Sequence, residues 1–279
     1  MSSPGAEGRL KVVLFCGGLG LRMGESTQKV PKPMITIGNR PILWHIMKYY
    51  AGFGYRDFIL CLGYKGEVIK QFFLDYNEAL SNDFVLSDGG RRVELISRDL
   101  HDWSITFVDT GLQSSIGQRL RLVEPFLGGA EIFLANYGDT LTDAPLPDMV
   151  EQLRSSDATA LFLSSRPTYN FHVARLDDAN RVLGIEDVTD SELWINAGYF
   201  VLRREIFDYM RPGEELVEEP FRRLIAEQKL LAYPYDGFWA PMDTLKERAN
   251  LDALFESGRA PWMRGRRAER RTDALEATG

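Results

Sequence analysis

The fold of this chain is decided by Lys11-Val-Val-Leu-Phe-Cys-Gly-Gly-Leu-Gly-Leu-Arg-Met-Gly24. A continuous apolar run over residues 10–15, followed by glycines, is typical of a strand that is buried on both faces of a parallel sheet. The glycines carry no side chain, so backbone N–H groups of the loop can turn together toward phosphate oxygens. A nearby arginine and lysine add positive charge. The candidate triphosphate-binding residues are therefore Gly17, Gly18, Gly20, Arg22 and Lys32.

This loop lacks the two best-known phosphate-binding motifs. The dinucleotide fingerprint needs G-x-G-x-x-G at the start of a helix, and the Walker loop needs a Gly-Lys-Ser/Thr ending. A plain glycine turn between a strand and a helix is the alternative that the loop alone leaves open. The basic residues and a second motif-bearing strand downstream favour nucleotide binding.

Composition and charge limit the classes of function. Of the 279 residues, 44% are hydrophobic and 26% are charged, and no apolar run approaches the roughly 18 residues of a membrane span. The net charge of −7 argues against a general nucleic-acid binder, so an anionic substrate must meet a local positive pocket. Cys16 and Cys61 lie in apolar runs and are expected to be buried, reduced thiols. Residues 1–8 hold no apolar signal segment, so a cytoplasmic location is expected, with no membrane partner.

Strand-like and helix-like segments alternate along the chain. A strand over 10–15, a helix over 41–53, a strand over 57–62 and a helix over 68–76 begin a βαβ pattern, which gives a parallel sheet. Further strands are expected over 92–96 and 104–108 around a turn at 99–102, and over 131–135, 159–164, 194–202 and 231–235. An antiparallel pair is expected over 172–176 and 182–185, and helices over 116–124, 146–154, 218–227 and 245–256. The predicted fold class is α/β: a Rossmann-like, mainly parallel mixed sheet flanked by helices, with a strand-rich acceptor-binding region.

One domain is expected over residues 10–262. Its nucleotide-binding core spans about 10–165, and residues 166–262 close the fold and bind the acceptor. Residues 1–9 and 263–279 lack apolar periodicity and are expected to be disordered. A partner-binding basic tail is the weaker alternative for the last segment.

Two aspartates are candidate metal ligands. A bound triphosphate needs its charge neutralised, and Mg²⁺ takes one or two protein carboxylates together with phosphate oxygens and waters. Asp139 ends a buried strand, where ligands collect at the carboxyl edge of α/β sheets. A turn-forming role is its alternative. Asp243 is the second candidate, with a helix N-cap before Leu245 as an equally weighted alternative.

Eight motifs carry a family resemblance that runs from about residue 11 to residue 262. They are Gly17-Gly-Leu-Gly-Leu-Arg-Met23, Lys32-Pro-Met34, Gly38-Asn-Arg-Pro-Ile-Leu-Trp-His-Ile-Met47, Gly63-Tyr-Lys-Gly66, Val108-Asp-Thr-Gly111, Tyr137-Gly-Asp139, Ile195-Asn-Ala-Gly198 and Phe238-Trp-Ala-Pro-Met-Asp-Thr-Leu245. The set resembles the sugar-1-phosphate nucleotidyltransferases, and three of the motifs favour the cytidylyl branch. The resemblance implies the nucleotide-diphospho-sugar transferase fold and a homo-oligomer.

The resemblance also implies a reaction. A sugar-phosphate oxygen attacks the α-phosphorus of CTP in line, and a CDP-sugar and pyrophosphate result. The nucleophile is already an anion, because the second pKa of a phosphate monoester is about 6, so no histidine has to act as a base. By position in the motifs, Arg22, Lys32 and Asp139 are the catalytic residues, Thr110, Gly111, Gly117 and Arg119 surround the base, Asp139 and Asp243 bind Mg²⁺, and His172, Glu186 and Asn196 face the acceptor.

The acceptor side departs from the family pattern at two places. Relatives carry Glu-Lys-Pro where this chain has Glu186-Asp187-Val188, and the family lysine grips the sugar phosphate. Relatives also carry Arg-Phe-Gly where this chain has Asn170-Phe-His172. One interpretation is a modest repacking of the loop. The other is that His172, with Arg166 or Arg175, replaces the lysine and that the acceptor is not plain glucose 1-phosphate.

Other functions remain open at this stage. A uridylyl- or thymidylyltransferase would use the same loop and metal ligands. A cytidylyltransferase for a non-glucose phosphorylated acceptor would account for the two departures. A catalytically weak nucleotide-binding scaffold is favoured only by the missing lysine, because a scaffold has no need for the complete triphosphate and metal set.

Overall fold

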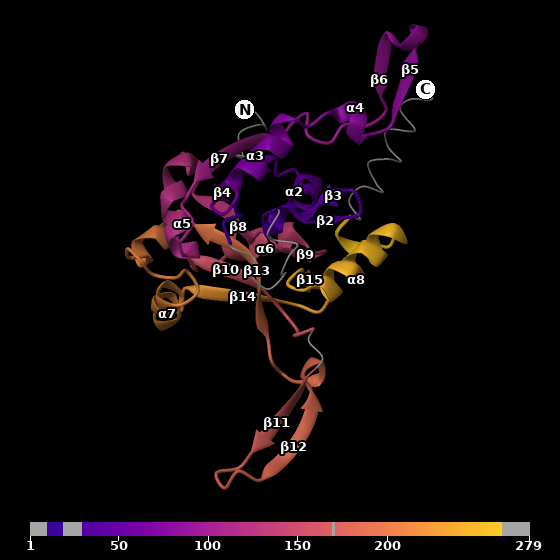
Figure 1. The fold of residues 1–279 in the computed structure, drawn as a ribbon. Coiled ribbons are helices and arrows are strands. Elements are labelled where there is room, and N and C mark those ends of the chain that lie inside the picture. Colours follow the sequence, from indigo (N-terminus) through magenta and orange to yellow (C-terminus); the bar gives the residue numbers. More distant parts are fainter. Residues whose placement is uncertain (1–9, 19–29, 169–170, 264–279) are drawn as a thin grey trace.

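A single seven-stranded sheet forms the centre of the described part of the molecule, which is a computed structural model covering residues 10–18, 30–168 and 171–263. The strand order is β14-β10-β13-β8-β1-β4-β7 (Figure 1). All neighbours run parallel except β13, which is antiparallel to both β8 and β10. The strands are β1 (Lys11–Phe15), β4 (Asp57–Leu62), β7 (Ser104–Asp109), β8 (Ile132–Tyr137), β10 (Ala160–Ser165), β13 (Ile195–Arg203) and β14 (Leu230–Tyr235). The predicted mainly parallel mixed sheet is confirmed.

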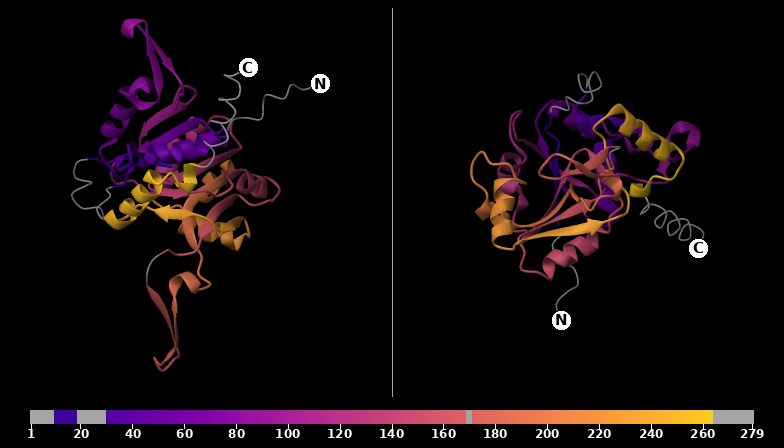
Figure 2. Two further views of the ribbon diagram at one scale, coloured as in Figure 1. Left: turned by 90° about the vertical axis from the view of Figure 1, so that its right-hand side faces the viewer. Right: turned by 90° about the horizontal axis from the view of Figure 1, so that it is seen from below.

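Helices cover both faces of this sheet (Figure 2). Along β1, Val12 and Leu14 point into the core beneath α2 and α6, whereas Val13 and Phe15 point into the core beneath α5 and α7. This two-sided burial explains why the strand is apolar without alternation. The helices are α2 (Ile42–Gly52), α3 (Gly66–Leu74), α4 (Glu78–Ser81), α5 (Ile116–Val123), α6 (Leu146–Arg154), α7 (Glu219–Ala226) and α8 (Leu245–Glu256). Among the described helices, none is long and apolar enough to cross a membrane.

Two β-hairpins stand out from the body in opposite directions (Figures 1 and 2). The first arm pairs β5 (Phe84–Ser87) with β6 (Arg92–Leu95), and the second pairs β11 (His172–Leu176) with β12 (Val182–Asp187). The second arm confirms the predicted antiparallel pair. The first arm corrects the sequence interpretation, because β6 pairs with the unpredicted β5 and β7 joins the main sheet beside β4.

The other predicted elements are present, with ends no more than two residues from their expected positions. Short pieces that were not expected include the helix α4, the pair β2 (Thr36–Ile37) and β3 (Arg40–Pro41), and the pair β9 (Thr140–Thr142) and β15 (Trp239–Pro241). Lys32–Met34 form the 3₁₀ turn η2. The sheet also takes strands from both predicted parts of the domain, since β13 lies between β8 and β10. Residues 1–9 and 264–279, whose disorder was expected, lie outside the described residues.

Gly117 is required by close packing rather than by backbone conformation. A Cβ at this position in α5 would overlap the backbone carbonyl oxygen of Glu214. Backbone atoms give way less easily than a flexible side chain, and overpacking of this kind costs about 1–3 kcal/mol.

We expect Gly117→Ala to lower the free energy of unfolding by about 1–3 kcal/mol, measured as a shift of the urea midpoint at constant m-value. Gly52→Ala is the matched control, because Gly52 is also helical and a Cβ there meets nothing within 4 Å. The control should be neutral or slightly stabilising, because alanine favours helix. Equal midpoints for the two variants would contradict the packing argument.

Candidate active site

The carboxyl ends of β1, β4 and β7 are held together by one buried side chain. Arg119, which is 3% exposed, extends from α5 and donates through Nη2 to the Gly17 carbonyl at 3.2 Å and through Nη1 to the Leu62 carbonyl at 3.2 Å. The same Nη1 donates to the Thr110 hydroxyl at 2.7 Å. A Cβ on Gly17 would overlap the guanidinium in this position, so a larger residue there would require the Arg119 side chain to shift. Arg119 therefore fixes the points from which the phosphate-binding and base-binding loops depart.

Three of the predicted base-binding residues surround this junction. Thr110 follows β7 and donates its backbone N–H and its hydroxyl to the Leu62 carbonyl at 2.9 and 2.7 Å. Gly111 has a φ of +86°, which favours glycine, and its N–H donates to the Asp109 carboxylate at 3.1 Å. Gly117 lies in the first turn of α5. The guanidinium of Arg119 is directed to protein atoms, which is a positioning role, and its contact with a base stays a prediction.

A lysine and two aspartates form the charged centre of the site. Lys32 Nζ lies 2.6 Å from Asp139 Oδ2 and 2.5 Å from Asp243 Oδ1. Lys32 is only 9% exposed. Burial by itself lowers the pKa of this ammonium, but the two carboxylates outweigh burial and raise the pKa above its usual value. The lysine is therefore a permanent cation between two carboxylates.

Short paired strands bring the two aspartates together. Asp139 follows Gly138 at the end of β8, and its carbonyl accepts a hydrogen bond from Met242 N–H at 2.9 Å. The neighbouring part of each segment lies in the β9–β15 pair, where Thr140 is opposite Pro241. The Asp139 backbone takes part in the turn after β8, while its carboxylate remains available to contact Lys32.

The structure rules out one of the two roles considered for Asp243, that of helix cap. The N-cap of α8 is Thr244, whose hydroxyl accepts from Glu247 N–H at 3.2 Å in a capping box. Glu247 in return accepts the N–H groups of Asp243 and Thr244 at 2.7 and 2.8 Å. The Asp243 side chain is therefore not the helix cap and contacts the ammonium instead.

This donor set fits a divalent cation. Two carboxylates converge on one cationic nitrogen, which shows that their oxygens can reach a common positive centre. Mg²⁺ takes one or two protein carboxylates and completes its shell with phosphate oxygens and waters, so two aspartates can be its only protein ligands. Of the other predicted phosphate-binding residues, Gly18 follows Gly17 after β1. Gly20 and Arg22 lie outside the described residues.

The predicted acceptor residues lie at or near the base of the second arm. Asn196 is the second residue of β13, a strand inside the main sheet, and its Oδ1 accepts Gly198 N–H at 2.9 Å. Glu186 in β12 forms a 3.9 Å ion pair with Arg175. Exposed His172 stands opposite Asp187 in the arm. In the arm His172 pairs with Asp187, whereas Glu186 pairs with Val173 and lies on the other face of the hairpin. None of the three shares an element with Lys32, Asp139 or Asp243.

Asp187 has a structural role. Its Oδ1 accepts the Thr189 N–H at 2.9 Å and the Thr189 hydroxyl at 2.8 Å, and so caps the 3₁₀ turn Val188–Asp190. These hydrogen bonds, with a smaller contribution from the charge of His172, hold the pKa of Asp187 below its usual value. The carboxylate that replaces the family lysine is thus directed at its own turn.

The two arginines considered as lysine substitutes have other contacts. The Arg166 guanidinium stacks on Trp194 at 4.1 Å and donates to the Ser191 carbonyl at 2.9 Å. Arg175 pairs with Glu186. His172, which is exposed, is the remaining candidate.

Several contributing residues were missed from the sequence. Glu247 orients Asp243, and Glu215 accepts the Ile116 N–H at the start of α5 at 3.1 Å. Glu214, in the acidic run 214–219, accepts a hydrogen bond from Arg223 Nη1 at its Oε2 at 2.7 Å, and this pairing lowers the pKa of Glu214 to about 2. A Thr-x-x-Glu pattern at 244–247 is the one local signal that could have revealed Glu247.

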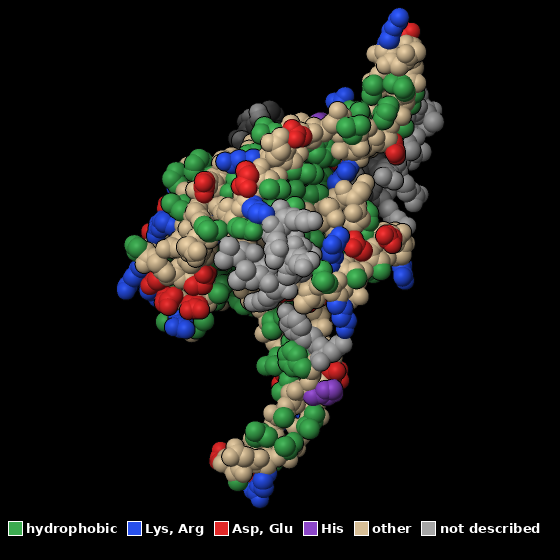
Figure 3. Space-filling model, viewed as in Figure 1, with side chains coloured by type: hydrophobic (Ala, Val, Ile, Leu, Met, Phe, Trp, Pro, Cys, Tyr) green, Lys and Arg blue, Asp and Glu red, His purple; other side chains and the backbone are tan. Residues whose placement is uncertain are grey.

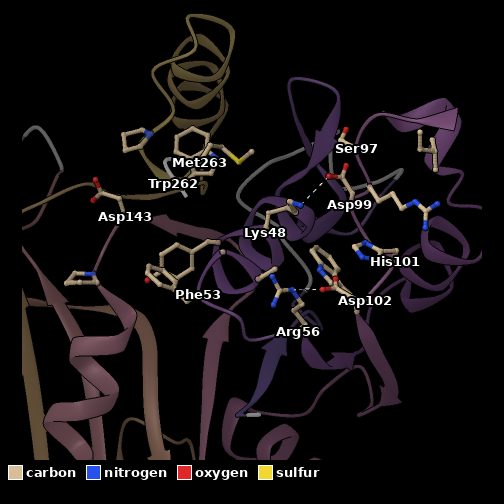
Figure 4. A pocket seen from close by; sticks show the side chains of 18 of the residues that line it. Lys48, Phe53, Arg56, Ser97, Asp99, His101, Asp102, Asp143, Trp262 and Met263 are labelled. Carbon is tan, nitrogen blue, oxygen red and sulfur yellow. Dashed lines mark ion pairs between the residues drawn. The ribbon is translucent and has the colours of Figure 1, made fainter. Parts of the chain in front are cut away.

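A cavity of about 880 Å³ lies away from these residues, between the end of α2, the segment before β7 and the 3₁₀ turn Pro261–Met263 (Figure 4). Two of its cations are paired with carboxylates: Lys48 with Asp99 at 3.2 Å and Arg56 with Asp102 at 2.8 Å. The cavity contains none of the predicted site residues. The predicted chemistry therefore does not belong to this cavity.

Comparisons with known proteins agree with this geometry. The nucleotidyl transferase family model matches residues 11–246. The glucose-1-phosphate cytidylyltransferase of Salmonella typhi is 36% identical over 255 residues, covering 91% of this chain and 98% of that protein. The probable glucose-1-phosphate cytidylyltransferase of Bacillus subtilis is 35% identical over 255 residues, covering 91% and 99%.

A solved UDP-glucose pyrophosphorylase complexed with UDP-glucose shares the fold, with a TM-score of 0.66 at 16% identity, covering 90% of this chain and 99% of that one. The fold is that of the nucleotide-sugar transferases. Enzymes of the matching family generally use a divalent metal. The family match over most of the chain, and relatives more than 30% identical over nearly their whole length, show that this chain belongs to the nucleotidyl transferase family.

Proposed function

We propose that this protein transfers CMP from CTP to a sugar 1-phosphate, with glucose 1-phosphate as the first acceptor to test. The products are a CDP-sugar and pyrophosphate. The observation that carries the proposal is the convergence of Lys32, Asp139 and Asp243 next to the end of β1, where Gly138 N–H donates to the Phe15 carbonyl at 3.2 Å. The names of the relatives support cytidylyl transfer in particular.

The reaction requires charge control rather than a base. A phosphate oxygen of the acceptor forms a bond to the α-phosphorus while the bond from that phosphorus to the leaving pyrophosphate breaks, and the attacking oxygen is already ionised. His45 is fully buried, with Nε2 3.0 Å from the Ile37 carbonyl and Nδ1 accepting from Trp262 Nε1 at 3.2 Å. It is a core residue, which agrees with a mechanism that needs no histidine base.

Lys32 supplies a permanent positive charge in this proposal. Its low exposure removes competing water, so its interaction with a phosphate oxygen is stronger than at the surface. Arg22 and the glycines of the loop add donors for the β- and γ-phosphates. The base is placed by the segments after β7, where Thr110 and Gly111 lie.

We propose Mg²⁺ as the metal, held by Asp139 and Asp243. When bound, it supplies charge neutralisation for the triphosphate and the departing pyrophosphate. Glu247 keeps the Asp243 backbone in place, and the β9–β15 pair keeps Asp139 beside it. The protein residues thus provide a fixed pair of carboxylates, and the nucleotide completes the coordination.

For the acceptor we propose the base of the second arm. Asn196 contacts the sugar, and His172 meets the phosphate in place of the lysine of relatives. Asp187 does not oppose this arrangement, because its carboxylate binds Thr189.

We further propose that the protein is a homo-oligomer. Both arms carry exposed apolar side chains, among them Leu86 and Val93 on the first and Leu183 and Ile185 on the second, each at least half exposed (Figure 3). Contiguous exposed apolar surface on a monomer marks an interaction site. Light scattering should give a mass of at least two chains, and a monomer at micromolar concentration would contradict the proposal.

The activity is tested by pyrophosphate release across a matrix of nucleotides and phosphorylated acceptors. CTP with a sugar 1-phosphate should give the largest kcat/KM, ahead of UTP and dTTP. Faster turnover with UTP or dTTP would show that CTP is not the preferred nucleotide. If no acceptor in a panel of phosphorylated sugars, polyols and phosphonates gives pyrophosphate release, the proposed transferase activity is rejected.

His172→Ala should raise KM for the sugar phosphate about tenfold or more, because a hydrogen bond to a charged group contributes about 1.5–3 kcal/mol. KM for CTP should stay unchanged. His101→Ala is the matched control, since His101 is an exposed histidine that lines the distant cavity. Unaltered acceptor KM and turnover in His172→Ala would remove this residue from the acceptor site.

A further inference from the structure

The Lys32 ammonium stands where the proposed metal has to bind. Its nitrogen is within hydrogen-bond distance of one oxygen from each carboxylate, at 2.6 Å from Asp139 Oδ2 and 2.5 Å from Asp243 Oδ1. These are the two protein ligands proposed for the divalent cation. An ammonium and a metal ion cannot share this point, because both are cations and both need the same oxygens.

Lys32 is the partner that can move. Asp139 is tied through its carbonyl to Met242 N–H at 2.9 Å, and Asp243 N–H is tied to Glu247 at 2.7 Å. The Lys32 backbone is also fixed, because its carbonyl accepts Ile35 N–H at 3.1 Å in η2. The lysine nitrogen, however, ends a four-carbon stem with rotatable bonds. Side-chain rotation alone can release the carboxylates.

When the ammonium leaves, the two carboxylates need another cation and the ammonium needs another anion. If the Lys32 ammonium moved away, Asp139 and Asp243 would lose the cation that they share. The ammonium, on a residue that is 9% exposed, would lose its two anionic partners. A metal–nucleotide complex supplies both replacements at once, since the cation satisfies the carboxylates and a phosphate satisfies the lysine. A free metal ion supplies only the first.

On this basis we propose that Lys32 and the divalent cation compete for Asp139 and Asp243, so that the free protein excludes the metal and loads it together with the nucleotide. This inference rests on the proposed function for the identity of the nucleotide. Lys32 then acts twice in the cycle, because the lysine that binds phosphate during transfer also keeps the metal site occupied between turnovers.

The test measures Mn²⁺ binding to the full-length protein without nucleotide, from the electron paramagnetic resonance signal of the free ion. We expect weak binding by the wild type and binding at least tenfold tighter by Lys32→Met, which keeps the length of the side chain without its charge. Asp139→Asn added to Lys32→Met should abolish the gain, which would place the ion at these carboxylates.

Lys11→Met is the matched control. Lys11 also pairs with an aspartate, Asp57 at 3.6 Å, but it lies at the opposite end of β1 from the site. This variant should bind Mn²⁺ as the wild type does. A gain in Lys11→Met equal to that in Lys32→Met would mean that a general change of charge is responsible, and it would overturn the proposal.

Two further results would overturn it. One is Mn²⁺ binding by folded Lys32→Met that is no tighter than that of the wild type. The other is micromolar binding by the wild type itself, which needs no variant and therefore decides the matter even if Lys32→Met and Lys32→Gln fail to fold. Because no turnover is involved, competition without CMP transfer would reject the proposed function alone, and CMP transfer without competition would reject this inference alone.

Discussion

One buried guanidinium determines where the site can be. Arg119 contacts the Gly17 carbonyl after β1, the Leu62 carbonyl at the end of β4 and the Thr110 hydroxyl after β7. Taking such a charge out of water is favourable only when its donors are satisfied. The three strand ends are therefore held in one arrangement. Gly17 belongs to that arrangement, because any side chain there would displace the guanidinium.

The charged centre depends on a second, independent junction. Asp139 and Asp243 lie far apart in sequence and meet through the β9–β15 pair and the Met242 to Asp139 hydrogen bond. Lys32 then brings the η2 turn to both of them. Since each carboxylate is held through its own backbone, the lysine is the one adjustable member of the cluster. The site combines fixed anions with a mobile cation, which suits a reaction in which charge arrives with the substrate.

Residues whose role is local, or whose burial is two-sided, could be predicted from the sequence. The apolar runs of β1, β4 and β8 belong to this group. The motifs also singled out Lys32, Asp139 and Asp243, whose side chains the structure brings together. Strand pairing in the first arm could not, because residues 84–87 are exposed and show no buried face, and 92–96 could pair with either neighbour. The contacts of Arg119 and Glu247 depend on partners that folding brings close, so the sequence did not indicate them. The contact of Arg119 with the base stays a prediction.

The two halves of the proposed reaction differ in how firmly the fold constrains them. The donor half rests on the sheet, where a side chain at Gly17 would displace the guanidinium that joins three strand ends. Of the proposed acceptor residues, Asn196 lies in β13 of the main sheet, whereas His172 and Glu186 lie on β11 and β12, which form a separate two-stranded sheet. Asp187 shows the consequence: a charge opposite to that of the family lysine is accommodated within one turn by Thr189. Acceptor specificity can therefore change at the arm while the phosphate and metal residues stay in place.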